Sequence, residues 1–440
     1  MTRSTRRPAR LTIKGGYDMK KDTPELGNTA GQFSRRSAMK FGAAGLAATT
    51  TLGFPNILRA QSDVIKIGHL TPKTGFLGAL GEYATLGIQL AVDQINDAGG
   101  VNGKMLDMIS EDSINPDTAT TKAQRMIERD NVDFLIGEIS SASALAISQV
   151  AARNEKLFIA VGPRSDVLRG KSCNKYMFCT DIPNTVMVNA VGGALKREGM
   201  VDGKKFMTLT ADYVFGHDLL SAAKNFFDAN NATLVADELV ATDVTDFSPF
   251  LIKVRQTQPD VVCLNLAGNQ VTNFVKQYAE FGLPFPTVGF NLNTADAWAA
   301  GVGNLSGTWP TPWYDTVDTD GTRAYVSSFK EAYGKLPENH SWISYVAMNI
   351  MAKAMGDTKS AATPDLIEYL ESGAKFDLLK GREGYFRKGD HQLIQDAYAF
   401  TVDGNAENEH DMIVLGDAVP DPDEDLEVIF PTVEQNGCTL

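Results

Sequence analysis

The sequence predicts an α/β protein made of two successive units, each built around a parallel sheet. Apolar runs of strand length alternate with helical patterns from residue 64 to residue 161. The same alternation restarts near residues 180–184 and continues to residue 290. Because 440 residues are too many for one ordinary domain, two units of one design fit the length. Helices that connect parallel strands lie on both faces of a sheet.

In the first unit, four predicted strands alternate with three predicted helices. Gly99 and Gly100 end the first helix, and Asn115 followed by Pro116 begins the second as a capping residue before a proline. Residues 71–83 are predicted to form a loop. The predicted strands cover residues 64–70, 104–111, 132–136 and 157–161. The predicted helices cover residues 84–98, 115–129 and 140–150.

The second unit has the same design and is followed by a different pattern. Its predicted strands cover residues 205–210, 233–240, 260–266 and 287–290. Its predicted helices cover residues 184–198, 215–230, 249–258 and 269–281. Residues 309–313 (WPTPW) break the alternation and are interpreted as a connector. Helices over residues 322–333, 341–355 and 364–371, a strand over 397–402 and an acidic tail complete the chain.

The charge distribution argues against nucleic acid as a partner. The chain has a net charge of −13, yet its first 60 residues contain 11 Lys and Arg against 3 Asp and Glu. The remaining residues are therefore strongly acidic, and no basic surface is left to neutralise phosphates.

The basic beginning of the chain has an explanation of its own. Residues 34–40 (SRRSAMK) precede a weakly apolar run over 41–54, and Ala60 offers a small residue for cleavage. This stretch resembles a twin-arginine export signal, which implies a soluble periplasmic protein cleaved near Ala60. The alternative is a basic amphipathic helix that stays in the mature protein. Translation from Met19 would give a leader of more usual length.

The four cysteines suit an oxidising compartment but leave the disulfide pairing open. Cys173 and Cys179 can close a small loop, while Cys438 in the polar tail can instead pair with Cys173. Cys263 lies in a strand-like apolar run and is interpreted as a buried free thiol.

Signatures of the common enzyme classes are missing from the sequence. No G-x-G-x-x-G follows a strand, Gly103-Lys104 lacks the rest of a phosphate-binding loop, and no HExxH occurs. Residues 137–141 (GEISS) lack the second glycine of a nucleophile elbow. Residues 421–425 (DPDED) are interpreted as a solvated tail and not as a calcium site. We therefore expect no enzyme activity, no cofactor and no metal.

Residues 132–148 (VDFLIGEISSASALAIS) predict a buried strand, a short turn and a helix opened by serines. Such a junction points backbone N–H groups and hydroxyls at one place, where the helix dipole also favours an anion. Ser141 and Ser143 are candidate contacts for a carboxylate, and Ser140 is the candidate cap. The alternative is that a serine only caps the helix.

Other polar and aromatic residues follow the predicted strands, where ligands bind in open parallel sheets. They include hydroxyls, amides, one arginine and aromatic rings, which suit a small polar solute with an apolar portion. These residues are Gly162, Arg164, Asp212, Tyr213, Phe215, Ala267, Asn269, Asn291 and Asn293.

Five stretches in the same order resemble one known family. They are VIKIGHL followed by T-P-x-T-G, LGIQLAVDQINDAGGVNGK, DFLIGEISSASALAIS, YVFG at 213–216 and SWISYVAMNIM. Residues 62–420 are thereby similar to type I periplasmic solute-binding proteins of the leucine/isoleucine/valine-binding family. The resemblance implies two Rossmann-like lobes with parallel sheets, joined by three crossovers and closing on ligand by hinge motion. It also implies a non-enzymatic role.

On that resemblance we expect four segments. Residues 1–60 form the signal, 61–182 with 312–383 form lobe 1, 183–311 with 384–425 form lobe 2, and 426–440 form a C-terminal tail.

The resemblance also places a ligand site. It implies that Ser141 and Ser143 hold the ligand carboxylate, with Gly162 and Arg164 on the neighbouring loop and Phe215 at an aromatic position. Asn291 stands where amino-acid binders often have the glutamate that holds an ammonium, and Asp212 is a candidate substitute.

Three further side chains have two interpretations each. Trp342, His340 and Trp313 are candidates for the apolar side of the pocket. The alternatives are helix core for Trp342, surface for His340 and hinge packing for Trp313.

The expected function is that of a monomeric substrate-binding component of an ABC importer. The ligand is expected to be an amino acid or a small organic carboxylate, including aromatic ones, and the partners are a membrane permease with cytoplasmic ATPases. The alternatives are a periplasmic ligand sensor of the same fold and a binder of amides or urea-like solutes.

Overall fold

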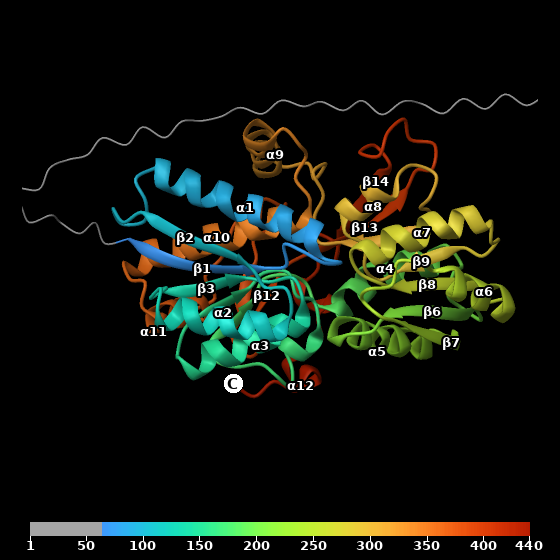
Figure 1. Cartoon of the computed structure of the whole chain (residues 1–440), viewed down its shortest axis with the longest axis horizontal. Helices are drawn as coiled ribbons and strands as arrows, with labels where there is room; N and C mark the ends of the chain where they lie inside the picture. Colours follow the sequence, from blue (N-terminus) through green and yellow to red (C-terminus); the bar gives the residue numbers. More distant parts are fainter. Residues whose placement is uncertain (1–63) are drawn as a thin grey trace, which may run out of the picture. The chain divides into compact units, whose positions relative to one another are not determined.

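The computed structural model describes residues 64–440, which lie within one compact unit. Strands and helices alternate along most of this part of the chain, as Figure 1 shows. The predicted signal and its cleavage near Ala60 lie outside the described residues.

The first sheet has seven strands in the order β11-β12-β5-β4-β3-β1-β2. All neighbouring strands are parallel except β11 and β12, so the predicted parallel sheet is confirmed. Its strands are β1 (Ile65–Thr71), β2 (Leu106–Asp112), β3 (Phe134–Gly137), β4 (Phe158–Ala160), β5 (Met177–Cys179), β11 (Tyr385–Arg387) and β12 (Gln392–Ile394).

Helices cover both faces of this sheet, and we call the sheet with these helices lobe 1. Figure 1 shows α1 and α10 on one face and α2 and α3 on the other. The helices of lobe 1 are α1 (Gly78–Asp97), α2 (Pro116–Glu128), α3 (Ser141–Arg153), η1 (Asp166–Leu168), α9 (Asp320–Tyr333), α10 (Asn339–Thr358) and α11 (Thr363–Leu370).

Lobe 2 contains a parallel four-stranded sheet, β7-β6-β8-β9, and a separate antiparallel sheet, β10-β13-β14, which packs against α4. Its strands are β6 (Lys205–Ala211), β7 (Thr233–Val240), β8 (Val261–Asn265), β9 (Thr287–Gly289), β10 (Thr308–Thr311), β13 (Ala397–Val402) and β14 (Ile413–Val419). Its helices are α4 (Asn184–Arg197), α5 (Val214–Ala229), α6 (Ser248–Thr257), α7 (Asn269–Phe281) and α8 (Thr294–Ala300).

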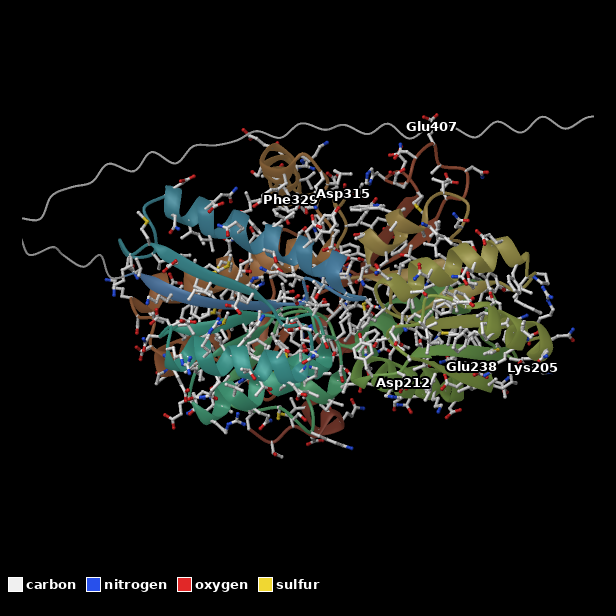
Figure 2. All side chains as sticks on the ribbon, viewed as in Figure 1. Lys205, Asp212, Glu238, Asp315, Phe329 and Glu407 are labelled. Carbon is white, nitrogen blue, oxygen red and sulfur yellow. A yellow bond between two sulfur atoms is a disulfide. The ribbon has the colours of Figure 1, made fainter. Side chains whose placement is uncertain are left out.

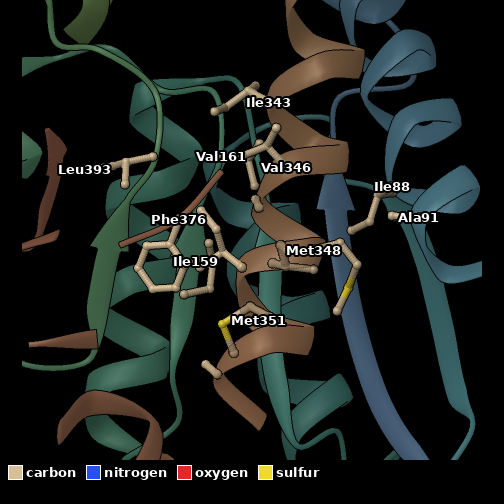
Figure 3. Packing of buried hydrophobic residues seen from close by; sticks show 14 of the residues in the cluster. Ile88, Ala91, Ile159, Val161, Ile343, Val346, Met348, Met351, Phe376 and Leu393 are labelled. Carbon is tan, nitrogen blue, oxygen red and sulfur yellow. The ribbon is translucent and has the colours of Figure 1, made fainter. Parts of the chain in front are cut away.

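In the core of lobe 1, α10 packs beside α1 on one face of the sheet, as Figure 3 shows. Val346 and Met351 of α10 are 1% and 0% exposed and belong to the same cluster as Ile88 of α1 and Ile159 of β4. The two helices approach closely because residue 87 is glycine. A Cβ at Gly87 would lie 2.0 Å from the carbonyl oxygen of Ser341, at the start of α10.

Three crossovers connect the lobes, at residues 180–183, 312–319 and 395–396. The buried ammonium of Lys380 donates to the carbonyl oxygen of Pro312 (3.0 Å) and to Gln395 Oε1 (2.9 Å). It also forms an ion pair with Asp396 (2.9 Å), while Gln395 Nε2 donates to the carbonyl oxygen of Thr180 (2.7 Å). Lys380 therefore joins the second and third crossovers directly and is linked to the first through Gln395, and the implied two-lobed fold is confirmed.

Helix α1 begins at Gly78, whereas the sequence predicted a loop up to residue 83. Glycine has low helix propensity, which explains why the sequence placed the start of this helix too far along the chain. A Cβ at Gly81 would lie 1.6 Å from the carbonyl oxygen of Pro72, so glycine lets the first turn pack directly on the preceding loop.

Several short elements were not predicted. Strands β5, β11 and β12 have three residues each, too few to display a period. Because β11 and β12 pair within the sheet of lobe 1, the predicted start of lobe 2 at residue 384 is wrong there. The other predicted domain limits stay predictions.

Part of the predicted connector at residues 309–313 is also a strand, β10. It lies at the edge of its sheet, where Pro310 is tolerated because one side of the strand needs no donor.

The C-terminal segment, predicted as a polar tail, folds back onto both lobes. It follows β14 and contains η2 (Leu426–Ile429) and α12 (Val433–Asn436). Ile429 and Phe430 pack against α4 of lobe 2, and Arg387 of lobe 1 donates to Glu427 (3.0 Å).

A disulfide joins Cys438 to Cys173 in lobe 1. The alternative pairing of Cys173 with Cys179 is wrong, because the Cys179 thiol is free and buried within the sheet. The predicted free, buried Cys263 is confirmed.

We expect the double substitution Cys173→Ser and Cys438→Ser to lower the free energy of unfolding by about 2–4 kcal/mol, because the disulfide closes a very long loop. Urea unfolding followed by tryptophan fluorescence measures this loss. Dithiothreitol should lower the stability of the wild-type protein and leave the double variant unchanged. Equal stability of wild type and variant would contradict a structural role for the disulfide.

Candidate ligand-binding site

A small cavity lies where the carboxyl ends of the two parallel sheets meet. Its volume is about 20 Å³, which accommodates about one water molecule. Both lobes contribute to its wall. The lining residues are Leu77, Leu80, Ile139, Gly162, Arg164, Tyr213, Phe215, Ala267, Asn291, Asn293 and His340.

Arg164 is the only permanently charged residue in this lining, and it is 3% exposed. It lies on the loop between β4 and η1, and its Nε donates to Asp181 Oδ2 (2.8 Å). Its Nη1 donates to the amide oxygens of Asn291 (2.6 Å) and Asn293 (3.1 Å) in lobe 2. Its Nη2 is buried without a hydrogen-bond partner among the described residues. The guanidinium therefore spans the two lobes and keeps one donor for a ligand.

The two asparagines are oriented by their own amide nitrogens. Asn291 Nδ2 donates to the carbonyl oxygen of Leu266 (3.0 Å), and Asn293 Nδ2 donates to Asp296 Oδ2 (3.0 Å). Both amide oxygens are thereby left to face Arg164. Burial raises the pKa of Asp296 to about 6, against the opposing effect of the hydrogen bond from Asn293.

The serines at the start of α3 lie outside the cavity lining, and one of them holds the loop that carries Arg164. Ser140 is the N-cap, as predicted, and its hydroxyl accepts from the backbone N–H of Ser143 (3.4 Å). Ser141 Oγ accepts from the backbone N–H of Ser165 (3.2 Å) and so fixes the loop that carries Arg164. Neither Ser141 nor Ser143 lines the cavity, although both are buried. Their predicted contact with a carboxylate stays a prediction.

Glu138, just before these serines, was not predicted as part of the site. It is 1% exposed and has a φ of 71°, in the left-handed region. Its Oε1 accepts from the backbone N–H groups of Ile139 (3.0 Å) and Ser140 (2.8 Å), which stabilises this unusual turn. Burial raises the pKa of Glu138 to about 7.

Aromatic and aliphatic side chains form the apolar part of the cavity. Tyr213 and Phe215 come from lobe 2, with ring centroids 5.7 Å apart. Phe76 of lobe 1 meets the Tyr213 ring edge-on at 5.5 Å. Leu77 and Leu80 were not predicted to line the site, because the start of α1 was expected to be a loop. A correct helix start would have placed both residues on one helical face.

Asp212 and Trp342 were predicted to contact the ligand, but they do not line the cavity. Asp212, labelled in Figure 2, is exposed before α5 and pairs with His217 (2.9 Å). Trp342 is fully buried and stacks on Trp313 with a centroid distance of 5.8 Å, which agrees with helix core for Trp342 and with hinge packing for Trp313, in the crossover at residues 312–319. Its Nε1 donates to the carbonyl oxygen of Leu378 (2.9 Å). Sequence spacing does not reveal which way such side chains point.

His340 lines the cavity and is 2% exposed, so the alternative of a surface position is wrong. No Asp or Glu is among the lining residues, since Asp181 and Asp296 lie behind Arg164 and Asn293. The arrangement suits an anionic group at Arg164 next to an apolar body. It offers no carboxylate in direct contact with a ligand ammonium.

Comparisons with a family profile and with a curated relative both identify binding proteins as similar to this chain. A sequence profile described as "Periplasmic binding protein" matches residues 64–408. A relative in Brucella abortus, Leu/Ile/Val-binding protein homolog 8, is 27% identical over 313 residues, covering 67% of this chain and 77% of the relative.

Solved structures share the fold. A periplasmic binding protein from Burkholderia mallei has a TM-score of 0.78 and 25% identity, covering 86% of this chain and 99% of that protein. A solute-binding protein of an ABC transporter from R. palustris, in complex with benzoate, has a TM-score of 0.72 and 24% identity, covering 86% and 100%. At this identity the second likeness concerns the fold alone.

The part of the chain that the structure describes has no helix that is both long and apolar enough to span a membrane.

The buried Glu138 carboxyl predicts a pH-dependent stability. Because its folded pKa is raised from 4.5 to about 7, the folded state holds the proton more tightly than the unfolded chain does. Its contribution to stability is therefore full below pH 4.5 and is lost as pH rises through about 7.

Glu138→Gln keeps an oxygen for the two backbone N–H groups and removes the titration. We expect the variant to gain about 2–3 kcal/mol relative to wild type at pH 8, and much less at pH 5. Urea unfolding of both proteins at the two pH values measures this difference. If the free energies of unfolding of variant and wild type differed by the same amount at pH 5 and pH 8, this would contradict a buried carboxyl that titrates.

Proposed function

The chain belongs to the periplasmic binding protein family, and from that premise we propose that it is the substrate-binding component of an ABC importer. The proposed ligand is a small organic carboxylate, captured in the periplasm and delivered to a membrane permease with cytoplasmic ATPases. The twin-arginine pattern in residues 34–40 is consistent with export. We expect the protein to act as a monomer without catalysis.

The observation that carries the proposal is the buried, unpartnered Nη2 of Arg164 beside an apolar wall. A guanidinium binds a carboxylate through two parallel hydrogen bonds, so Arg164 can exchange the neutral oxygens of Asn291 and Asn293 for a charged group. Tyr213 and Phe215 would then cover the apolar body of the ligand.

Hinge motion follows from the size of the site. A cavity of about 20 Å³ cannot hold an organic acid, so a ligand enters only when the lobes separate or Arg164 moves. When the lobes close again, lobe 2 contributes contacts that exist only in the bound state. Ligand binding therefore shifts the equilibrium toward closure.

Two ligand classes fit the family, and the lining favours one of them. The Brucella abortus relative is named for Leu, Ile and Val, which are zwitterions, whereas the R. palustris protein holds benzoate. An α-ammonium needs an anionic partner, and no lining residue supplies one. A carboxylate without an ammonium, aromatic or branched, is therefore the preferred class, and benzoate is the first probe.

Arg164→Lys tests this assignment while keeping the positive charge. Because lysine cannot form the two-pronged contact, we expect benzoate to bind about 10–100-fold more weakly than to wild type. Isothermal titration calorimetry on residues 61–440 measures both dissociation constants. Arg323→Lys, on the exposed side of α9, is the matched control and should bind as wild type does. Equal affinity of Arg164→Lys and wild type would remove Arg164 from the ligand site.

A further inference from the structure

His340 stands out because it lines the cavity and the mechanism proposed above leaves it unused. It is the second residue of α10 in lobe 1 and is 2% exposed. A buried imidazole whose nitrogens are not all hydrogen-bonded loses free energy relative to one in water. Such a side chain in a ligand site is a candidate for ligand recognition.

The orientation of the imidazole is fixed through Nδ1. This nitrogen lies 3.3 Å from Glu338 Oε2 and 3.2 Å from Asn339 Nδ2. Glu338 is itself held, because its Oε1 accepts from the backbone N–H groups of His340 (2.7 Å) and Ser341 (3.0 Å). The capping box at the start of α10 thus helps to fix the orientation of the imidazole ring.

The groups that orient the ring lie at the start of α10, where Asn339 also contacts lobe 2: its Nδ2 donates to Asn293 Oδ1 (3.3 Å) and its Oδ1 accepts from the backbone N–H of Thr294 (3.2 Å). Glu338 and Asn339 are part of the start of α10, and the edge of the ring packs on the loop after β4, where a Cβ at Gly162 would lie 3.0 Å from His340 Cδ2. The contacts of the ring with Glu338 and with the loop after β4 lie within lobe 1 and do not involve lobe 2.

The other ring nitrogen, Nε2, makes no hydrogen bond to any residue between 64 and 440. Because His340 lines the cavity, a ligand there can supply this partner. A hydroxyl suits this nitrogen in either tautomer, because a hydroxyl both donates and accepts.

We propose that His340 determines specificity by hydrogen bonding, through Nε2, to a hydroxyl on the ligand. This inference rests on the proposed function and narrows its substrate class to hydroxylated carboxylates. Arg164 and His340 both line the cavity, so one ligand there would place its carboxylate at Arg164 and its hydroxyl at His340.

When the lobes separate, the apolar residues of the lining offer packing surface for a flat ring. Leu77 and Leu80 of lobe 1 and Tyr213 and Phe215 of lobe 2 supply apolar and aromatic surface there. A hydroxybenzoate combines a carboxylate, a rigid apolar body and a hydroxyl at the opposite end, without an ammonium.

The test compares benzoate, 3-hydroxybenzoate and 4-hydroxybenzoate by calorimetry on wild type and His340→Phe. We expect at least one hydroxybenzoate to bind wild type about 5–10-fold more tightly than benzoate. This is the gain in affinity that one added hydrogen bond gives. In His340→Phe, the ratio of the dissociation constant of benzoate to that of the hydroxybenzoate should fall to about one. His340→Gln, which can still donate and accept, should recover part of the preference.

Tyr345→Phe, on the same helix but away from the cavity, is the control and should keep the wild-type ratio. Bound benzoate reports that a variant is folded. A wild-type ratio near one, or a preference that survives in His340→Phe, would overturn the role of His340 alone. Failure of all three probes to bind wild type would overturn the proposed carboxylate ligand, and this inference with it.

Discussion

The buried guanidinium of Arg164 is the constraint on which the site depends. A permanent charge withdrawn from water is tolerated only where other groups replace its hydration. Asp181, in the first crossover, supplies the opposite charge, and Asn291 and Asn293 supply oxygens from lobe 2. The site is therefore complete only where the lobes meet. A carboxylate that competes for the guanidinium acts on the contact between the lobes as well as on the local charge.

A second buried cation, Lys380, acts on the hinge itself. Its ammonium links the crossovers through Pro312, Gln395 and Asp396, and lies 5.0 Å from the centre of the Trp342 ring. Burial lowers the pKa of Lys380, against the opposing effect of Asp396. The two cations lie at separate places, because Lys380 contacts the segments that pass between the lobes and Arg164 lines the cavity, where it is the proposed ligand contact. Replacing Arg164 by an uncharged residue would leave Asp181 buried without its ion-pair partner. Asp396 would keep an ion pair with Arg382 (3.5 Å) if Lys380 were replaced.

Local sequence patterns were sufficient for the fold but not for the details of the site. The strand at residues 397–402 was predicted with its observed limits, and the strand-end rule identified Gly162, Arg164, Tyr213, Phe215 and Asn291, which meet at one cavity. The misses arise from properties that a single sequence does not display. Asp212 follows a strand as Arg164 does, yet its side chain turns to His217 at the surface. The pairing of Cys173 with Cys438 depends on how the chain end folds back.

The central claim is that Arg164 receives the carboxylate of the ligand. A crystal structure of residues 61–440 grown with benzoate tests it most directly. The account predicts a carboxylate oxygen about 3 Å from Nη2 or Nη1 of Arg164, with the ring between the apolar residues of the two lobes. A bound benzoate whose carboxylate lies elsewhere, with Arg164 still hydrogen-bonded only to Asp181, Asn291 and Asn293, would contradict it.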